Sequence, residues 1–380
     1  MTPLPTVVPT IEEFAEHARS FIAAHKSVAP PDWGAIMPPE HAEAGRAWQR
    51  LLYDNGFAGI HWPVEYGGRG LTSAHTGAWM VECALAGVPP VLNMVGLVLA
   101  GQGILAFGTD AQKAELLDAT LRGDIVWCQL FSEPGAGSDL GSLSTRAEAF
   151  DNHFIVNGQK VWTSGGRVSD WGILMARTDP SAPKHHGISF FVIPMNLPGI
   201  DVRPLKQMTG DAEFDEVFFT DVAIESTCLL GPLNQGWNVG MVTLTSERGH
   251  IGTSVISLSK RLASITALSA SGSGLSATQR QAVAKLYSRG FAFKAMGQRQ
   301  GPQASTASSL MKLGITEMMF DIAMLRGDLA GPYAMLEGSE ARGMTQAPGG
   351  RIAGGSSQVQ RNIIGERLLG LPREPKPATG

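Results

Sequence analysis

The sequence predicts an α+β fold in which a helical segment, a β-rich segment and a second helical segment follow one another. Apolar residues recur at helical spacing in the first and last thirds of the chain, and short β-prone runs separated by turn residues fill the middle. At 380 residues, of which 43% are hydrophobic, the chain is long enough for a large buried core. We therefore expect three domains, at residues 1–124, 125–230 and 231–380.

Composition excludes several classes of protein. The formal net charge is −4 and like charges form no long run, so the chain has no basic stripe that could bind nucleic acid. Cys83, Cys128 and Cys228 lie far apart, which is typical of a reducing compartment such as the cytoplasm and argues against disulfides and a structural zinc site. The first residues hold no basic patch followed by an apolar stretch, so we expect no signal peptide.

Residues 84–107 form an uncharged, mostly apolar segment that has the length of a membrane span. Pro89, Pro90 and repeated glycines interrupt this segment. Such interruptions suit a pair of packed interior helices better than a span, so we expect no membrane span.

The N-terminal segment is predicted to be helical. We expect an amphipathic helix to begin at Ile11 and a second, capped helix to begin at Asp110. Between them, residues 61–70 hold too much glycine and proline for a helix and predict a compact loop.

The middle segment is predicted to be a sheet. Residues 154–162 hold two short β-prone runs on either side of Asn157 and Gly158, which together are a strong signal for a hairpin turn. Residues 187–194 and 216–219 predict further strands. Their spacing favours a small antiparallel barrel or sandwich.

The C-terminal segment returns to helical periodicity. Apolar residues at steps of three, four and seven predict one continuous helical stripe: Met241, Leu244, Ile251, Val255, Leu258 and Leu262. A Ser/Gly-rich connection from Ser269 and further helical stretches are expected after it.

Two segments of the middle region could bind a ligand, although each also has a structural explanation. Residues 132–139 form a Gly-rich turn with hydroxyls at Ser132 and Ser138, which could cradle a pyrophosphate or a carbonyl. By itself this turn is better explained as a tight connection into the first strand. Trp162, two residues before Ser164, could flank a flat aromatic cofactor, but a lone tryptophan at a strand end more often belongs to the core.

The C-terminal segment offers two more candidates. Arg248 falls within the apolar stripe and Glu247 lies one residue beside it, and buried charge is costly unless it is paired. The two residues could form a structural ion pair, or Glu247 could be a base in a dry pocket. The Gly-rich turn at residues 354–357 leads into a helix that Ser356 or Ser357 is expected to cap; the helix start could also receive an anionic or carbonyl group.

The order and spacing of these segments resemble the acyl-CoA dehydrogenase family across nearly the whole chain. The matching stretches are WPVEYGG at 62–68, FGTDAQKAELL at 107–117, FSEPGAGSDL at 131–140, NGQKVWTSGG at 157–166, GWNVGMVTLTSERG at 236–249 and GGSSQVQRNIIGERLLGLPRE at 354–374. The resemblance implies a helical N-terminal domain, a central antiparallel β-barrel and a C-terminal four-helix bundle, usually assembled as a tetramer. It also implies FAD between the barrel and the C-terminal helices. By position, contacts with the flavin and the substrate are expected from Gln129, Phe131, Ser132, Gly137, Ser138, Trp162, Ser164, Ser356 and Gln358.

The resemblance further implies the chemistry. A base takes an α-proton from an acyl-CoA while a hydride leaves Cβ for the flavin, which gives a trans double bond, and the electrons pass to an electron-transferring flavoprotein. The backbone N–H of Gly354 is expected to polarise the thioester carbonyl together with a flavin hydroxyl. Many members place the catalytic Glu where this chain has Gly354, whereas members of the isovaleryl-CoA dehydrogenase type place it on the long C-terminal-domain helix. That second position is Glu247, so Glu247 is expected to be the base and Arg248 to steady the pocket.

Two family motifs are missing from the sequence. An Arg-x-x-Phe-Gly motif is not found between Ser269 and Gln300, and a Gln-x-x-Gly-Gly-x-Gly motif is not found before the last loop. A related subunit could supply the missing cofactor contacts, so a homotetramer and a heterotetramer both stay open. The alternatives are a subunit with an incomplete cofactor site, and a flavin monooxygenase or oxidase on the same fold.

Small or flexible residues occupy the positions that line the acyl pocket in the family. They are Ala84, Ala86, Gly87, Val88, Leu92, Val95, Gly96 and Gly101. They favour a bulky or branched acyl group, of which a sterol side chain is one example. Close packing between helices is the other explanation.

Overall fold

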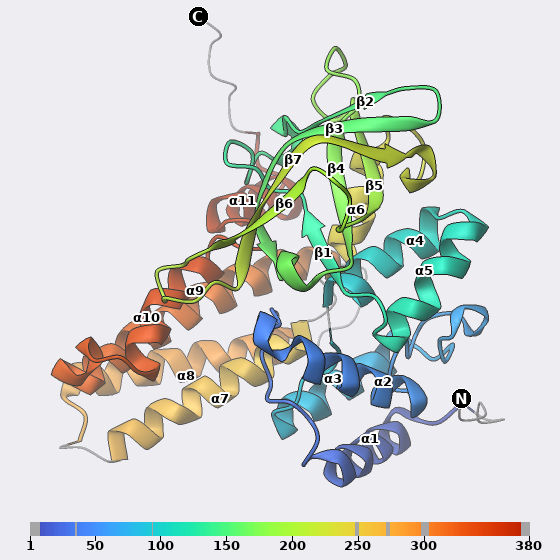
Figure 1. The fold of residues 1–380 in the computed structure, drawn as a ribbon. Helices are drawn as coiled ribbons and strands as arrows, with labels where there is room; N and C mark the ends of the chain where they lie inside the picture. The colour runs from blue at the N-terminus through green and yellow to red at the C-terminus, as the bar shows by residue number, and fades with distance from the viewer. Residues whose placement is uncertain are drawn as a thin grey trace, which may run out of the picture. The chain divides into compact units, whose positions relative to one another are not determined.

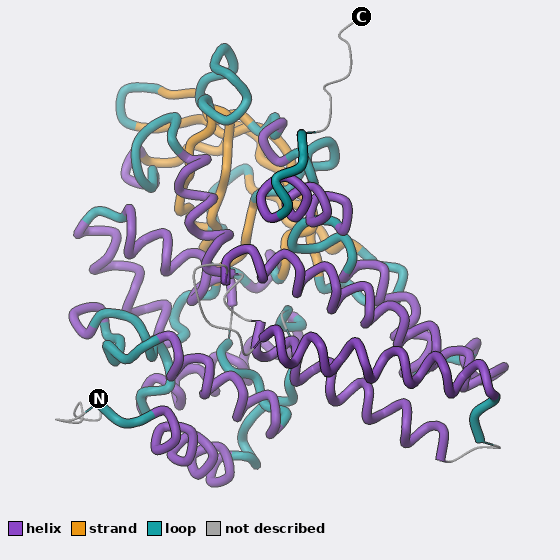
Figure 2. The backbone as a smooth tube through the Cα atoms, turned by 180° about the vertical axis from the view of Figure 1, so that it is seen from behind, coloured by secondary structure: helices purple, strands orange, loops and turns teal. Residues whose placement is uncertain are grey.

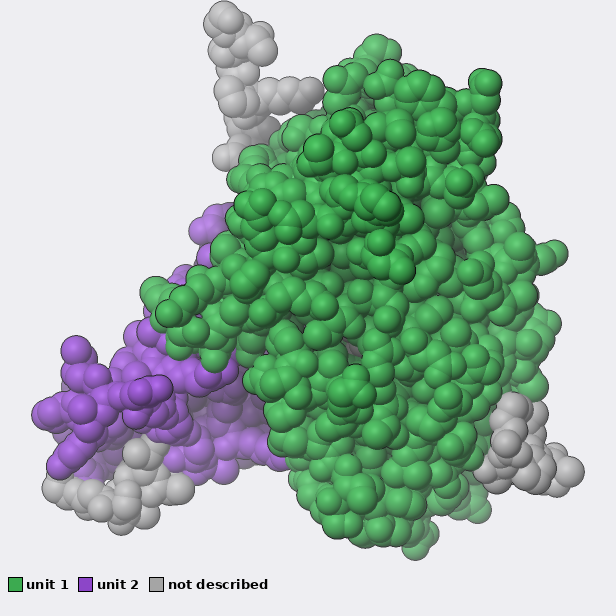
Figure 3. All heavy atoms as spheres, viewed as in Figure 1, with its two compact units in different colours: residues 1–247 green, residues 248–380 purple. Residues whose placement is uncertain are grey.

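The computed structural model describes residues 8–34, 36–92, 94–247, 251–270, 274–297 and 304–373. The chain divides into two compact units, residues 1–247 and residues 248–380 (Figure 3). The first unit contains the N-terminal helices and the whole sheet, and the described part of the second unit is helical. The predicted α+β order of helices, sheet and helices is confirmed (Figure 1).

Helices form the beginning of the first unit. Their bounds are Ile11–His25 (α1), Ala42–Asp54 (α2), Ser73–Ala86 (α3), Gly101–Phe107 (α4) and Asp110–Arg122 (α5). The predicted starts of α1 and α5 are confirmed, because the hydroxyls of Thr10 and Thr109 accept hydrogen bonds from the backbone N–H groups of Glu13 and Gln112. The side chains of Glu13 and Gln112 return to the capping residues and complete two capping boxes.

The uncharged segment at residues 84–107 is divided into short pieces. α3 ends at Ala86, a π-helical turn occupies Val95–Ala100, and α4 begins directly after it. Among the described residues, no helix combines the length and the apolar character that crossing a membrane requires.

The middle of the chain forms one curled seven-stranded sheet, with the order β1-β4-β2-β3-β7-β6 and with β5 on the other side of β4 (Figure 1). The strands are Trp127–Leu130 (β1), Arg146–Ala149 (β2), His153–Ser164 (β3), Trp171–Arg177 (β4), Ile188–Pro194 (β5), Ile200–Leu205 (β6) and Phe214–Glu225 (β7). Most pairs are antiparallel, but β1 and β2 both pair with β4 in parallel. The expected β-barrel is therefore an open half-barrel with a mixed sheet.

The hairpin turn predicted at Asn157 and Gly158 is wrong. β3 runs through both residues without turning, and its register against β7 shifts there as at a β-bulge. The side-chain amide of Asn157 donates to the carboxylate of Asp221 on β7 at 3.0 Å. Its side-chain oxygen accepts from the backbone N–H of Asp221 at 2.9 Å. The real turn lies between β2 and β3, where the N–H of Phe150 donates to the carbonyl of His153 at 2.9 Å. Cross-strand pairing thus overrides the local turn signal.

The two faces of the sheet are buried in different apolar clusters. Trp127 of β1 belongs to the cluster that includes Leu117 and other side chains of the N-terminal helices. Cys128 and Leu130 belong to a second cluster, made mainly of strand residues. Because side chains alternate along a strand, Gln129 lies on the helix-covered face of β1.

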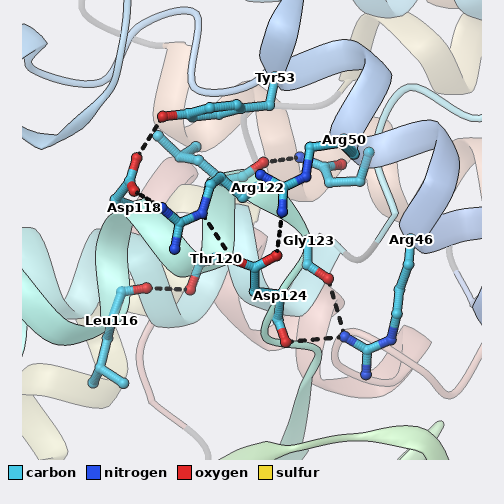
Figure 4. A network of polar contacts seen from close by, with 11 residues as sticks. Arg46, Arg50, Tyr53, Leu116, Asp118, Thr120, Arg122, Gly123 and Asp124 are labelled. Carbon is cyan, nitrogen blue, oxygen red and sulfur yellow. Dashed lines mark hydrogen bonds and ion pairs between the residues drawn. The ribbon is translucent and has the colours of Figure 1, made fainter.

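Polar contacts fix the connection that leads from α5 into β1 (Figure 4). Arg122 pairs with Asp118 at 2.6 Å and with Asp124 at 2.7 Å. The indole N–H of Trp127 donates to the buried hydroxyl of Thr120 at 2.8 Å. These contacts therefore fix the position of the first residue of β1 relative to the end of α5.

The described part of the second unit consists of helices (Figure 2). They are Ile251–Ala270 (α7), Ala277–Gly297 (α8), Ala304–Ala330 (α9), Ser339–Gly350 (α10) and Ser357–Ile363 (α11). Leu258 and Leu262 of α7 pack in one apolar core with Leu286 of α8 and Met318 of α9. α10 packs against α9.

The apolar stripe predicted from Met241 to Leu262 is divided between two cores. Leu244, on the helix Gly236–Glu247 (α6), packs against the core of the first unit, whereas Leu258 and Leu262 pack in the second. Its continuity through residues 248–250 lies outside the described residues.

Candidate functional site

The residues predicted to contact the cofactor from the sheet lie where β1 and β3 meet. The N–H of Val161 donates to the carbonyl of Ser132 at 2.9 Å, so the segment after β1 lies beside β3. Gln129 and Phe131 share a face, because side chains alternate along the strand. The structure therefore brings Gln129, Phe131 and Ser132 close to Trp162, the residue after Val161.

Trp162 is held in an unusual conformation. Its φ is +61°, which is uncommon for a residue other than glycine, and the register between β3 and β7 shifts at this point. The indole meets the ring of Phe214 edge to face at 5.7 Å, yet 56% of Trp162 remains exposed. The alternative that Trp162 belongs to the core is therefore wrong. An exposed indole on a constrained backbone is suited to packing against a flat ligand.

Ser164 lines a hollow between the sheet and the N-terminal part of the chain. The space in it that a water-sized sphere can occupy is about 20 Å³, which is room for about one water molecule. The lining residues are Ile36, Met37, Leu92, Met94, Val95, Val126, Ser164, Gly165 and Val168. Leu92 and Val95, two of the residues predicted to line an acyl pocket, thus share this hollow with Ser164.

Gly101 was also predicted to line an acyl pocket, but its packing explains why it is a glycine. The ring of the buried Trp62 occupies the place that a β-carbon on Gly101 would take. At this position close packing, the second explanation offered by the sequence, accounts for the glycine.

A buried ion pair joins Lys160 of β3 to Glu133, in the turn that follows β1. The Lys160 ammonium donates to the Glu133 carboxylate at 2.8 Å and to the carbonyl of Phe131 at 3.1 Å. The carboxylate also accepts hydrogen bonds from the N–H groups of Ser144 at 2.6 Å and Thr145 at 2.8 Å. The pair therefore fastens the strand that carries Trp162 to the turn that follows β1.

Both members of this pair are charged at neutral pH. Burial alone would raise the pKa of the Glu133 carboxyl, but the Lys160 charge and the hydrogen bonds from Lys160, Thr145 and Ser144 lower it to about 2. Burial lowers the pKa of Lys160 to about 8, against the attraction of Glu133, which raises it. Sequence reasoning missed this pair, because its two members are far apart in the chain.

A second buried carboxylate supports the turn after Ser164. Asp215 of β7 is fully buried and lies 2.7 Å from the guanidinium of Arg167, whose backbone N–H also donates to it at 3.0 Å. Burial raises the pKa of Asp215, and the contacts from Arg167 oppose that rise. This pair, which sequence reasoning also missed, holds the backbone that positions Ser164.

The polar side chains of this region suit a flat heterocyclic cofactor such as FAD. Within the described parts of the chain, no hydrogen-bond partner is found for the side chains of Gln129, Ser132, Ser138 and Ser164. Gly137 and Ser138 are exposed on the turn after β1. Free hydroxyl and amide groups beside an exposed indole could bind the polar edge and the face of a flavin ring.

The C-terminal loop that precedes α11 belongs to the second unit and carries the candidates Gly354, Ser356 and Gln358. The Ser356 hydroxyl accepts from the N–H of Val359 at 3.3 Å, so the expected helix cap is confirmed at Ser356. Gln358 and Gly354 are exposed, and Gly354 has a φ of +63°.

The two remaining candidates are the pair Glu247 and Arg248. Glu247 is the last residue of α6, but its side chain, like the whole of Arg248, lies outside the described residues. A structural ion pair and a catalytic base therefore both remain predictions for this pair.

Family models match most of the chain. Residues 9–124 match the acyl-CoA dehydrogenase N-terminal domain, residues 128–222 the middle domain, and residues 273–369 the C-terminal domain. The chain is also 36% identical over 387 aligned positions to a Mycobacterium tuberculosis protein named acyl-CoA dehydrogenase IpdE1, covering 96% of this chain and 99% of the relative.

Solved structures show the same fold. One described as Tcur3481-Tcur3483 steroid ACAD matches with a TM-score of 0.81 and 25% identity over 96% of this chain and 98% of that chain. The ChsE4-ChsE5 complex from Mycobacterium tuberculosis matches with a TM-score of 0.77 and 26% identity over 97% of this chain and 99% of that chain.

Proposed function

Because the chain belongs to the acyl-CoA dehydrogenase family, we propose that it oxidises the Cα–Cβ bond of an acyl-CoA thioester to a trans double bond with FAD as its cofactor. The observation that carries this proposal is the exposed, conformationally constrained Trp162 beside free polar side chains at the junction of β1 and β3. We further propose that the electrons pass to an electron-transferring flavoprotein.

FAD, when bound, would supply the acceptor for the hydride that leaves Cβ of the substrate. Trp162 would pack against the flat ring, and Phe131 would contact the ring or the substrate. The remaining contacts with cofactor and substrate are assigned to Gln129, Ser132, Gly137, Ser138, Ser164, Ser356 and Gln358.

Proton removal is assigned to Glu247, which takes the α-proton of the thioester, with Arg248 beside it. The backbone N–H of Gly354 donates to the thioester carbonyl and stabilises the negative charge that develops there. One such donor is worth about 3–4 kcal/mol in comparable oxyanion sites. Gly354 carries no carboxylate, so it cannot itself be the base.

The direct test is the Glu247→Gln variant, assayed by anaerobic flavin reduction with an acyl-CoA. Flavin content and substrate binding should remain, whereas the reduction rate should fall by about 10²–10⁴, the usual contribution of a general base. Glu225→Gln, at an exposed position of β7, is the matched control. A loss smaller than about tenfold would leave the assignment of the base wrong.

The same assay separates the proposal from other flavin chemistry on this fold. Reduced enzyme with product bound should react slowly with oxygen and quickly with an electron-transferring flavoprotein. Rapid reoxidation in air would indicate an oxidase or a monooxygenase instead.

A heteromeric assembly is the second candidate, in which a related subunit completes the cofactor site. The absence of the motifs Arg-x-x-Phe-Gly and Gln-x-x-Gly-Gly-x-Gly favours it, and one structural relative is a two-protein complex. Purification of the chain by itself, with its flavin absorbance and native mass, tests this candidate. A coloured homotetramer that oxidises acyl-CoA would exclude it, and a colourless, inert chain would support it.

A bulky, ring-containing acyl group is the proposed substrate class. A structural relative is described as a steroid ACAD, and the chain's positions in the acyl region are mostly small. Flavin bleaching with isovaleryl-CoA, octanoyl-CoA and cholanoyl-CoA tests this class. A preference for octanoyl-CoA would contradict it.

A further inference from the structure

The loop between α10 and α11 has an unusual backbone that other side chains hold in place. Gly354 and Gly355 are consecutive and have φ values of +63° and +91°, which favour glycine at both positions. In the function proposed above, on which this inference rests, the N–H of Gly354 donates to the thioester carbonyl.

The two glycine carbonyls are both bound within the second unit. The buried Gln360 side chain donates to the Gly354 carbonyl at 3.2 Å. The Lys312 ammonium of α9 donates to the Gly355 carbonyl at 2.6 Å. On the other side of the loop, the N–H of Ala353 donates to the carbonyl of Gly349 at 2.9 Å. The two peptide units that flank the one joining Ala353 to Gly354 are thus both hydrogen-bonded.

Glu317 of α9 fixes the end of the same loop. Its carboxylate accepts the Ser357 hydroxyl at 2.7 Å and pairs with Arg351 at 3.1 Å and with Arg361 at 3.6 Å. The N–H of Ser357 donates to the carbonyl of Arg351 at 2.9 Å. α9 therefore holds the loop through a cation at Lys312 and an anion at Glu317.

Three consecutive donors find no acceptor among the described residues: the N–H groups of Gly354, Gly355 and Ser356. Of these three residues, Gly354 is exposed. We infer that Lys312 and Gln360, together with Glu317 at the end of the same loop, are positioning residues that aim the Gly354 N–H at the carbonyl oxygen of an acyl thioester. Holding a donor in advance lowers the cost of reorganisation when charge develops on that oxygen.

The test uses the purified FAD-bound protein and the variants Lys312→Met and Gln360→Met. The substrate is whichever of isovaleryl-CoA, octanoyl-CoA and cholanoyl-CoA the wild type oxidises fastest. Each variant should lower kcat by at least about tenfold with little change in KM, because the lost interaction matters mainly in the transition state. Lys312→Arg, which keeps a donor, should restore most of kcat.

A second measurement does not depend on turnover. Hydrogen exchange in the peptide that covers residues 349–357 should speed up in both variants and stay at the wild-type rate in Lys312→Arg. Lys285→Met, at an exposed lysine of α8, is the matched control and should change neither measurement. Gln360→Met gives an independent answer if Lys312→Met does not fold.

The outcomes separate this inference from the proposed function. An active wild type whose two variants keep kcat within about twofold would overturn the inference alone, as would a rise in KM at constant kcat. A wild type that bleaches with none of the three thioesters would overturn the proposed function, and the inference with it.

Discussion

The Lys160 ammonium lies 2.8 Å from the Glu133 carboxylate, and almost no part of either side chain reaches solvent. Lys160 belongs to β3 and Glu133 to the turn after β1, so the pair joins the two segments that carry most of the candidate cofactor contacts. Burying the two charges costs desolvation free energy, which their mutual attraction offsets. Removing only one partner is more costly still, because the other charge then stays buried without a partner.

Removing one partner of this pair should destabilise the protein strongly. Glu133→Gln leaves the buried Lys160 charge uncompensated, so the free energy of unfolding in urea should fall by about 3–5 kcal/mol. The double variant Glu133→Gln/Lys160→Met should recover much of this loss. Asp201→Asn breaks an exposed pair with Arg203 and should cost at most about 1 kcal/mol. Equal losses in Glu133→Gln and Asp201→Asn would show that the buried pair does not stabilise the fold.

Acid should weaken the protein through the same carboxylate. The folded-state pKa of Glu133 is about 2, below the ordinary value near 4.3, so the unfolded chain takes up a proton first as the pH falls. The contribution of Glu133 is therefore complete above the ordinary value and is lost as the pH falls towards 2. Between about pH 5 and pH 3, the free energy of unfolding should fall more steeply in the wild type than in the double variant. Parallel pH profiles would contradict this.

A methyl group on Gly101 should destabilise the first unit. The buried ring of Trp62 occupies its place, so Gly101→Ala should lower the free energy of unfolding by about 1–3 kcal/mol through overpacking. Gly77→Ala is the matched control, because Gly77 lies in α3 with open space around its Cα. That change should stabilise the protein by about 0.5–1 kcal/mol. Denaturant unfolding of both variants checks the two opposite signs.

Loss of the exposed indole should weaken cofactor binding. In Trp162→Leu the flat surface is removed, and FAD should bind up to about tenfold more weakly, as expected for an aromatic contact of about 0.5–1.5 kcal/mol. Titration of FAD into cofactor-free protein measures this change. Phe150→Leu removes an exposed aromatic side chain from the β2–β3 turn and should leave the affinity unchanged. A Trp162→Leu protein with wild-type affinity would show that the indole does not contact the cofactor.

Short sequence patterns predicted helix starts well, because the contacts that form a helix start join residues close together in the chain. Capping residues placed the starts of α1 and α5, because a cap depends on residues only three positions apart. The same kind of signal failed at Asn157 and Gly158, where pairing with β7 keeps β3 extended. A two-residue turn signal cannot outweigh a ladder of cross-strand hydrogen bonds.

The candidate site was only partly accessible from the sequence. Motifs pointed to Trp162 and to the turn at residues 132–139, but the exposure of Trp162 follows from a bulge that no motif encodes. The supports at Lys160, Lys312 and Asp215 were missed, since each acts on a segment far away in the chain.

The sequence by itself determined the order of helices and strands, the family and the candidate residues, because periodicity, capping and motif spacing are all local in the chain. Only the tertiary structure decided that Lys160 lies against Glu133, 27 residues away, and that Lys312 binds the Gly355 carbonyl, 43 residues away. Such contacts depend on how the chain packs on itself, and burial gives them their strength.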